Sequence, residues 1–229
     1  MSAGRRVLNG GELAILEHEI VSCRLCPRLV AWREEVAREK RAAFRDEEYW
    51  GRPVPGFGDP EADVVVFGLA PAAHGANRTG RYFTGDRSGD FLFSALYRTG
   101  FAGSPVSRRP DDGMRLYGLW ISAAVRCAPP QNRPTPAERD ACLPYAAREL
   151  ELLHAKVLVC LGAFAWDAAL RLLGVRPKPK FAHGAEHEAG SPVLLGCYHP
   201  SQQNTFTGVL TPEMLDSILS RALKLSETG

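Results

Sequence analysis

The sequence predicts an α/β fold with three α/β/α layers and a central, mainly parallel sheet of four strands. Four short apolar runs are typical of strands that are buried on both faces of a parallel sheet. Helical stretches fall between these runs, and the alternation favours parallel strands with helices on both faces. The chain of 229 residues is long enough to bury one such core. We therefore expect a single domain over residues 11–229, with residues 1–10 as a flexible N-terminal tail.

The predicted elements follow from these patterns in chain order. The strands cover Val64–Leu69, Leu119–Val125, Lys156–Leu161 and Val193–Cys197. The helices cover Glu12–Val21, Arg28–Arg45, Gly89–Thr99, Pro136–His154, Ala163–Leu173 and Pro212–Leu225. The segment Trp50–Asp59 is rich in Pro and Gly and is predicted to be a loop. The helix at Pro136 has the clearest start, because Thr135 is a good N-cap and Glu138 completes a capping box.

Composition and charge limit the classes of function. The net charge is only +2, so contact with a nucleic acid must rest on a local basic patch. There is no run of about eighteen apolar residues, and the N-terminal segment lacks the apolar region of a signal peptide. We expect a soluble, intracellular protein, in which the six cysteines are metal ligands or core residues rather than disulfides.

Four of the cysteines form a candidate metal site. Cys23 and Cys26 are spaced as C-x2-C, Cys127 follows a predicted strand, and Cys142 lies in the capped helix. Four thiolates from two distant segments can enclose zinc or an iron–sulfur cluster. The wide second spacing differs from the paired C-x2-C knuckles of zinc ribbons, but spacing alone leaves zinc open. The other two cysteines lie in strand runs and are interpreted as core residues, namely Cys160 and Cys197.

The chemistry is expected in the loops after Leu69, Val125 and Cys197, because ligands bind beyond the carboxyl ends of parallel strands. The first of these loops is rich in small residues, which let the backbone approach a ligand closely. Within it, Phe83 either stacks on a planar base or anchors the loop to the core. Asp86 either caps the helix that follows or activates water as a carboxylate.

The last loop begins with Tyr198 and His199, directly after the predicted strand Val193–Cys197. A histidine there suits the stabilisation of a developing anion, although a lone histidine is more often a structural hydrogen-bond donor. The polar residues that follow can contact phosphates or wedge into a base stack, and they are Ser201, Gln202, Gln203 and Asn204. Arginines near the strand ends can also hold phosphates, namely Arg78, Arg81, Arg87 and Arg126.

Taken together, these motifs resemble the iron–sulfur uracil-DNA glycosylases, and among them family 5, also called type b. The cysteine spacings match the cluster signature of families 4 and 5. GLAPAAHGANRTGRYFTGD and HPSQQNT match the two active-site motifs of family 5. WREE, PGFGDP, AAVRCAPPQN and PTP extend the similarity over about Cys23 to Leu223. The resemblance implies the uracil-DNA glycosylase fold and a monofunctional DNA repair enzyme that flips uracil out of DNA and hydrolyses its N-glycosidic bond.

The resemblance also implies roles for single residues. Phe83 would stack on the flipped base, and His199 would donate a hydrogen bond to uracil O2. Asp86 would position or activate water, and Asn132 would lie on the pocket side. A structural [4Fe–4S] cluster near the DNA-binding surface would be held by Cys23, Cys26, Cys127 and Cys142.

Two departures from family 4 bear on specificity. Family 4 has an acidic residue shortly after the proline of the first motif, whereas Pro71 is followed here by Ala72 and Ala73. Family 4 also has an asparagine that reads the uracil edge, and the matching position here is Ala123. Both departures are typical of family 5 and leave room for a larger ring. We therefore expect deaminated purines to be excised besides uracil, with hypoxanthine first.

The expected partner is double-stranded DNA that contains uracil or another deaminated base, with single-stranded DNA as an alternative. We expect a monomer in a bacterial or archaeal cytosol, associated with the nucleoid and not with a membrane. One alternative is a non-catalytic or covalently trapping uracil-DNA-binding relative. Such relatives carry an inserted KRRIH-type loop, which is missing between Gly75 and Asp86. The other alternative is a zinc-stabilised nucleotide-binding protein without hydrolase activity.

Overall fold

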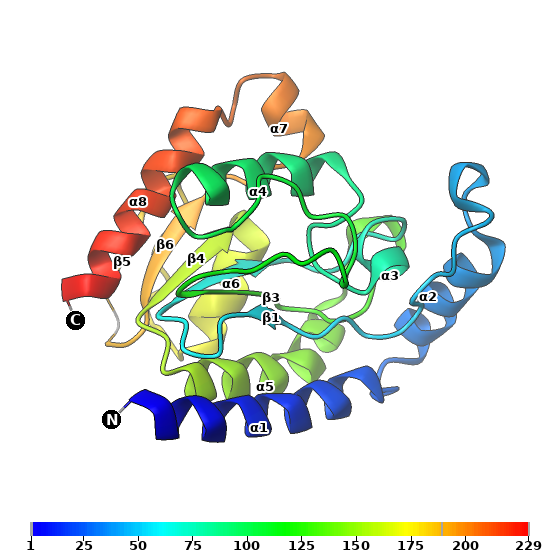
Figure 1. The fold of residues 1–229 in the computed structure, drawn as a ribbon, viewed down its shortest axis with the longest axis horizontal. Helices are drawn as coiled ribbons and strands as arrows, with labels where there is room; N and C mark the ends of the chain where they lie inside the picture. The colour runs from blue at the N-terminus through cyan, green and yellow to red at the C-terminus, as the bar shows by residue number, and fades with distance from the viewer. Residues whose placement is uncertain (1, 189, 229) are drawn as a thin grey trace.

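The computed structural model describes residues 2–188 and 190–228 and has the predicted α/β architecture (Figure 1). Its mixed, mostly parallel sheet has six strands in the order β1-β3-β2-β4-β6-β5. The four central strands are parallel and are the predicted ones, β2 (Val64–Gly68), β3 (Leu119–Ala123), β4 (Val157–Leu161) and β6 (Val193–Cys197). The edge strands β1 (Phe57–Gly58) and β5 (Glu186–His187) are antiparallel to their neighbours. The expected four-stranded sheet is thus corrected to six strands, because a two-residue strand carries no periodic pattern.

The register of the central strands places their carboxyl ends at one edge of the sheet. Val64 in β2 pairs with Leu119 in β3 and with Val157 in β4, and Val157 pairs with Val193 in β6. Each of these residues is the first of its strand, so the four strands start level. The loops that follow the strands therefore leave the sheet side by side, which is the arrangement that forms ligand sites in such folds.

Helices cover both faces of the sheet, α4 (Arg87–Arg98) and α8 (Pro212–Thr228) on one and α5 (Pro136–Leu153) and α6 (Ala163–Leu172) on the other (Figure 1). Side chains of a strand alternate between the two faces. Accordingly, Val64 and Val66 pack in the hydrophobic cluster that contains α4 and α8. Val65 and Phe67 pack in the cluster that contains α5 and α6. The α/β/α layering is thereby confirmed.

Two helix boundaries differ from the prediction. Helix α1 (Ser2–Val21) packs along α5 and begins inside the segment expected to be a tail. The predicted helix began at Glu12, but in the structure Gly10 and Gly11 lie inside one continuous helix. Helix α2 (Pro27–Glu39) ends well before Arg45, because Lys40 adopts a φ of +56° and closes the helix.

Several one-turn elements lie in the connecting segments. The 3-10 helix η1 (Ala42–Phe44) follows α2. The other three lie in loops at the carboxyl edge of the sheet, and they are α3 (Ala76–Thr79) after β2, η2 (Pro130–Asn132) after β3 and α7 (Gln202–Phe206) after β6. A single turn is too short to show apolar periodicity, so none of them is predicted by the sequence.

Helix α5 begins with the predicted capping box. Glu138 N donates to the Thr135 hydroxyl at 3.2 Å, and Thr135 N donates to Glu138 Oε2 at 2.7 Å. Each of these bonds satisfies a backbone N–H that the first turn would otherwise leave unpaired. Across residues 2–188 and 190–228, no helix combines the length and the apolar character that crossing a bilayer requires.

Candidate active site

One cavity lies where β2, β3 and β6 end, and it has a volume of about 320 Å³. This size falls within the range of small-ligand pockets. Its wall contains seven of the predicted site residues, Ala72, Phe83, Asp86, Ala123, Asn132, His199 and Ser201. Four others lie outside the wall, Ala73, Gln202, Gln203 and Asn204. Residues from three separate loops are thus brought to one hollow, as expected for the carboxyl edge of a parallel sheet.

Phe83 is held in the wall by a tight turn. Its φ of +55° lies in the left-handed region, which is uncommon for a bulky residue and is found mainly where the surroundings enforce it. Gly89 permits the turn, because a Cβ at this position would collide with the Phe83 carbonyl group. The ring lines the cavity and also packs against the main hydrophobic cluster. The position of Phe83 agrees with its interpretation as an anchor to the core, while stacking on a planar base stays a prediction.

Asp86 lies at the start of α4 and faces the cavity. Its Oδ1 accepts a hydrogen bond from Gly89 N at 2.9 Å, so the residue is the N-cap of this helix. Its Oδ2 approaches Gly75 so closely that a Cβ on that glycine would be 2.5 Å away. Burial raises the pKa of this carboxyl above its usual value, against the opposing effect of the backbone N–H groups of Gly89 and Ser88. A partly desolvated carboxylate of this kind is a stronger base than an exposed one.

His199 lies opposite, in the loop after β6. Burial lowers the pKa of its imidazole to about 4, so the ring is neutral at pH 7 and can donate through one nitrogen. The His199 carbonyl accepts a hydrogen bond from Asn204 Nδ2 at 2.8 Å, which fixes the loop. The centroids of the His199 and Phe83 rings are 6.2 Å apart, with the ring planes at 37°. A flat ligand can thus meet an aromatic face and a neutral donor in the same hollow.

The wall also includes Tyr82, which the sequence left unassigned, beside the predicted Asn132. Tyr82 is buried in the wall, and its hydroxyl donates to the Val54 carbonyl at 2.9 Å. Its place next to Phe83 in the first motif was a signal that could have identified it. Asn132 enters the wall from η2 with a φ of +55°, directly after Gln131 at +54°. Two successive left-handed residues direct this asparagine toward the cavity.

Comparison with known proteins bears on the family of this chain. The model of the uracil DNA glycosylase superfamily matches residues 55–223. A type-5 uracil-DNA glycosylase of Mycobacterium bovis is 58% identical over 221 residues, which are 94% of this chain and 82% of the relative. This chain belongs to the type-5 uracil-DNA glycosylases. The predicted family and fold are thereby confirmed.

A second type-5 relative agrees with this assignment, whereas a type-4 relative is less similar to this chain. A type-5 enzyme of Thermus thermophilus is 54% identical over 210 residues, which are 90% of this chain and 95% of the relative. A type-4 uracil-DNA glycosylase of Pyrobaculum aerophilum is 34% identical over 130 residues, which are 56% of this chain and 59% of the relative. The type-5 match is both higher in identity and longer, in accordance with the alanines at positions 72, 73 and 123.

In the last loop of this type-5 glycosylase, two of the polar residues, Ser201 and Asn204, form hydrogen bonds within the loop itself. Ser201 caps α7 by accepting from Asn204 N at 3.3 Å, while Asn204 also bonds the His199 carbonyl. Gln202 and Gln203 are exposed. At the end of α7, Phe206 is 67% exposed, and the Arg87 guanidinium lies 5.3 Å from its ring centroid. Sequence reasoning missed Phe206, although an aromatic side chain with so large an exposed fraction is unusual.

Three of the four arginines expected to hold phosphates are instead internal. Arg78 bonds the His74 carbonyl at 2.9 Å and pairs with Glu47, and Arg126 is buried against Glu149. Arg81 bonds Asp112 Oδ1 at 2.7 Å. Only Arg87 of the four is exposed. The expectation fails for the other three because each organises a loop or the core, and a buried guanidinium cannot reach a phosphate.

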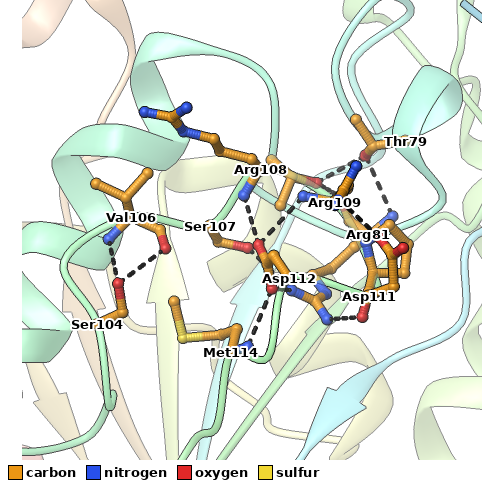
Figure 2. Close-up of polar contacts among 12 residues, drawn as sticks. Thr79, Arg81, Ser104, Val106, Ser107, Arg108, Arg109, Asp111, Asp112 and Met114 are labelled. Carbon is orange, nitrogen blue, oxygen red and sulfur yellow. Dashed lines mark hydrogen bonds and ion pairs between the residues drawn. The ribbon is translucent and has the colours of Figure 1, made fainter.

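The Arg81 interaction organises the segment that joins α4 to β3 (Figure 2). Besides Asp112, its guanidinium bonds the Ser107 hydroxyl at 3.1 Å. Asp112 also accepts from the backbone N–H groups of Arg108 and Arg109. Although burial alone would raise it, these backbone bonds and Arg81 bring the pKa of Asp112 down to about 2. Arg81 thereby holds the segment between α4 and β3 in place. Tyr82 and Phe83 of the cavity wall follow Arg81 directly in the chain.

The four cysteines of the predicted metal site line one small cavity beside α2. Cys23 and Cys26 precede this helix, Cys127 follows β3, and Cys142 lies in α5. Within the described part of the chain, no three Cys, His, Asp or Glu side chains are placed to share one metal ion as they stand. The two cysteines interpreted as core residues are buried, which confirms that interpretation for Cys160 and Cys197.

A second hollow, of about 580 Å³, lies near the end of α6. Its lining includes Arg176, Lys178 and His187 but no carboxylate or aromatic ring other than that imidazole. None of the residues singled out by the sequence borders it. The smaller cavity at the strand ends is therefore the better candidate for catalysis.

Proposed function

We propose that this protein excises uracil that has been flipped out of DNA, and that the cavity at the strand ends receives the base. The observation that carries the proposal is the meeting of an aromatic ring, a carboxylate and a neutral imidazole in one hollow, from Phe83, Asp86 and His199. A flipped base is held by stacking and by hydrogen bonds to its edge. Cleavage of its bond to the sugar needs stabilisation of the charge that develops.

The proposed reaction is hydrolysis of the bond between C1′ and the base nitrogen. The electron pair of this bond leaves with the base, and the oxygen of a water molecule bonds to C1′. His199 donates a hydrogen bond to the base oxygen on which negative charge grows. Asp86 stabilises the positive sugar and takes the proton of the water, while the base is protonated from solvent. Because Oδ1 of Asp86 is engaged by Gly89 N, Oδ2 is the oxygen available to the water.

Single-turnover release of free base tests this function. An oligonucleotide duplex with a U·G pair should yield free uracil and an abasic strand when mixed with excess protein. Retention of the intact uracil strand in a tight or covalent complex would instead support the non-catalytic alternative.

We further propose that the pocket accepts deaminated purines, first hypoxanthine and then xanthine. Ala123 and Ala72 line the cavity and form no hydrogen bond to a base edge with their side chains. A pocket with buried polar side chains rejects bases that cannot pair with them, because those side chains would be left without hydrogen bonds. The alanines at these positions impose no such requirement on the base. Recognition would rest on Phe83, His199 and Asn132. Release of hypoxanthine from a matched duplex tests this proposal, and undetectable release beside fast uracil release would contradict it.

For the DNA surface, we propose that the end of α7 and the start of α4 contact the strand around the flipped nucleotide. The cavity residues Asp86 and His199 are followed in the chain by exposed residues, which are Arg87 on one side and Gln202, Gln203 and Phe206 on the other. A cation suits a phosphate, and an exposed aromatic ring can insert between bases. Double-stranded DNA is the proposed partner, with single-stranded DNA as an alternative, and the protein is proposed to act as a cytosolic monomer.

We also propose that Cys23, Cys26, Cys127 and Cys142 hold a [4Fe–4S] cluster. The donor set fits the group, because four sulfurs line one cavity and Arg126 N donates to Cys142 Sγ at 3.3 Å, the type of bond that accompanies cluster ligands. The bound group would supply a cross-link between the start of α2 and helix α5. Iron and sulfide analysis tests this, together with broad visible absorption. Zinc without iron would overturn it.

A further inference from the structure

Arg33 is a buried cation that has no buried anionic partner among residues 2–188 and 190–228. It lies in α2 and is 2% exposed. Among the described residues, the one carboxylate recorded in an ion pair with it is that of Glu34, at 4.0 Å. Glu34 is 44% exposed and already bonds Arg24 at 2.5 Å. The Nε atom of Arg33 is buried and has no hydrogen-bond partner in the described part of the chain. A buried charge of this kind is strongly unfavourable unless an anion compensates it.

The guanidinium of Arg33 is directed at the predicted metal ligands. Its Nη1 donates to Cys127 Sγ at 2.8 Å, and its Nη2 donates to the Cys23 carbonyl at 3.2 Å. Arg33 also lines the same cavity as the four cysteines. The anion that would compensate this cation must therefore lie among the sulfurs.

The other arginines around the cysteines are neutralised by carboxylates. Arg28 bonds Glu138 at 2.7 Å, and Arg126 bonds Glu149 at 2.5 Å. These two ion pairs add little net charge to the cavity. Arg33 therefore carries the uncompensated positive charge beside the sulfurs.

We propose that Arg33 compensates the charge of the iron–sulfur cluster and sets its reduction potential. This inference rests on the proposed cluster. An iron–sulfur centre with four thiolate ligands is anionic, and it becomes more negative when it gains an electron. A nearby cation and an N–H bond to a ligand sulfur favour the reduced state and help to hold the ligand in place. Without Arg33, the reduction potential moves to more negative values and the ligands bind iron less firmly.

Three variants of the full chain, purified with their iron, test the proposal. Arg33→Met keeps the length of the side chain but removes its charge, and Arg33→Lys keeps the charge but loses the planar fork. Arg38→Met removes an exposed charge from the same helix and is the matched control. The reduction potential is measured by optical titration, and iron loss is measured as its rate of release to a chelator.

The Met variant should have a more negative potential and should lose iron on the order of tenfold faster, as is typical for the loss of an outer-shell partner. The Lys variant should keep a potential close to that of the wild type, and Arg38→Met should match the wild type in both measurements. An iron-loaded Met variant with the wild-type potential would overturn the proposal. If Arg33→Met retains no iron, the test rests on Arg33→Lys, which keeps the positive charge. Equal loss of iron from Arg33→Lys would show that the charge of Arg33 does not stabilise the cluster, and the proposal would be overturned.

The two proposals can fail separately. Zinc in place of iron in the wild-type protein would overturn the cluster, and this inference with it. Iron in the wild-type protein with an unshifted potential in Arg33→Met would overturn only the role of Arg33.

Discussion

Asp86 serves the helix and the cavity with different oxygens of one carboxylate. Oδ1 caps α4, while Oδ2 remains on the side of Gly75 and the pocket. The sequence offered cap and base as competing interpretations of this residue. The geometry accommodates both, since a cap needs only one acceptor.

The Asp86→Asn variant separates the two tasks. Asparagine is as good an N-cap as aspartate, so the melting temperature should change little. The variant lacks the negative charge, and its single-turnover excision of uracil should be slower by a factor on the order of 10²–10³. Excision at the wild-type rate would show that Asp86 is only a cap. The pH profile gives a second measurement. Burial raises the pKa of Asp86, so wild-type activity should fall in acid with a midpoint above the usual range of an aspartate, and the variant should lack this dependence.

His199 should make the stability of the fold depend on pH. Burial lowers its pKa to about 4, whereas an unfolded histidine titrates at about 6.5. Between these values the unfolded chain binds a proton at this position and the folded chain does not. The free energy of unfolding should therefore fall as the pH falls from about 6.5 to about 4, by at most ~1.4 kcal/mol per unit from this group. Denaturant titrations of His199→Gln at several pH values should show a free energy of unfolding that depends less on pH than that of the wild type. An unchanged pH dependence would contradict a lowered pKa of His199 in the folded protein.

Ala123 should control which bases the pocket accepts. It ends β3 within the cavity wall, so a larger polar side chain there would project among the base-binding residues. Ala123→Asn should slow hypoxanthine excision more than uracil excision, because the amide fills space and demands a matching edge. Ala73→Ser serves as the control, since Ala73 lies outside the wall. Equal slowing for both bases would show that Ala123 acts only through packing.

At the scale of elements, long periodic segments were predictable and short ones were not. The four central strands and α4, α5, α6 and α8 appear within a few residues of their predicted bounds, because each buries a continuous apolar face. The two-residue strands and the one-turn helices depend on tertiary contacts instead. The same limit applies to side chains. The sequence led to the cavity residues, but it could not show that Arg78, Arg81 and Arg126 turn inward, since their carboxylate partners Glu47, Asp112 and Glu149 lie far from them in the chain.

The exposed end of α7 provides a test of the proposed DNA surface. Phe206→Ala should weaken binding to a uracil duplex and slow excision, because base–aromatic stacking contributes about 1–3 kcal/mol. Tyr97→Ala is the matched control, since Tyr97 is an aromatic residue 51% exposed near the opposite end of α4. Binding is measured by fluorescence anisotropy with a labelled duplex. Equal effects of the two substitutions would argue against a specific role for Phe206.

At the scale of the whole molecule, the cysteine cavity joins segments that are far apart in the chain. The start of α2, the segment directly after β3 and helix α5 meet there. Cys142→Ser should therefore lower the melting temperature and the iron content together, while leaving the side chains of the base cavity unaltered. Cys160→Ser is the comparison, because Cys160 is buried in β4 away from that cavity. The Cys160→Ser variant should retain its iron even if the substitution weakens the packing of the core around β4. A Cys142→Ser protein with full iron content would exclude Cys142 as a ligand.

The two smallest strands have a consequence for behaviour at high concentration. A sheet whose outer strands are open offers a row of unpaired N–H and C=O groups to other molecules, and such rows promote the growth of aggregates. In this protein β1 pairs with β3 across Ile121 and Trp120, and β5 pairs with β6 across Leu195 and Leu194. Each short strand is antiparallel to its neighbour and pairs with part of the backbone N–H and C=O groups along the edge of that neighbour. Partial unfolding that releases only β1 or β5 would expose the unpaired backbone groups of β3 or β6 to other molecules. The base cavity would remain intact, so the protein can aggregate and precipitate before its activity falls.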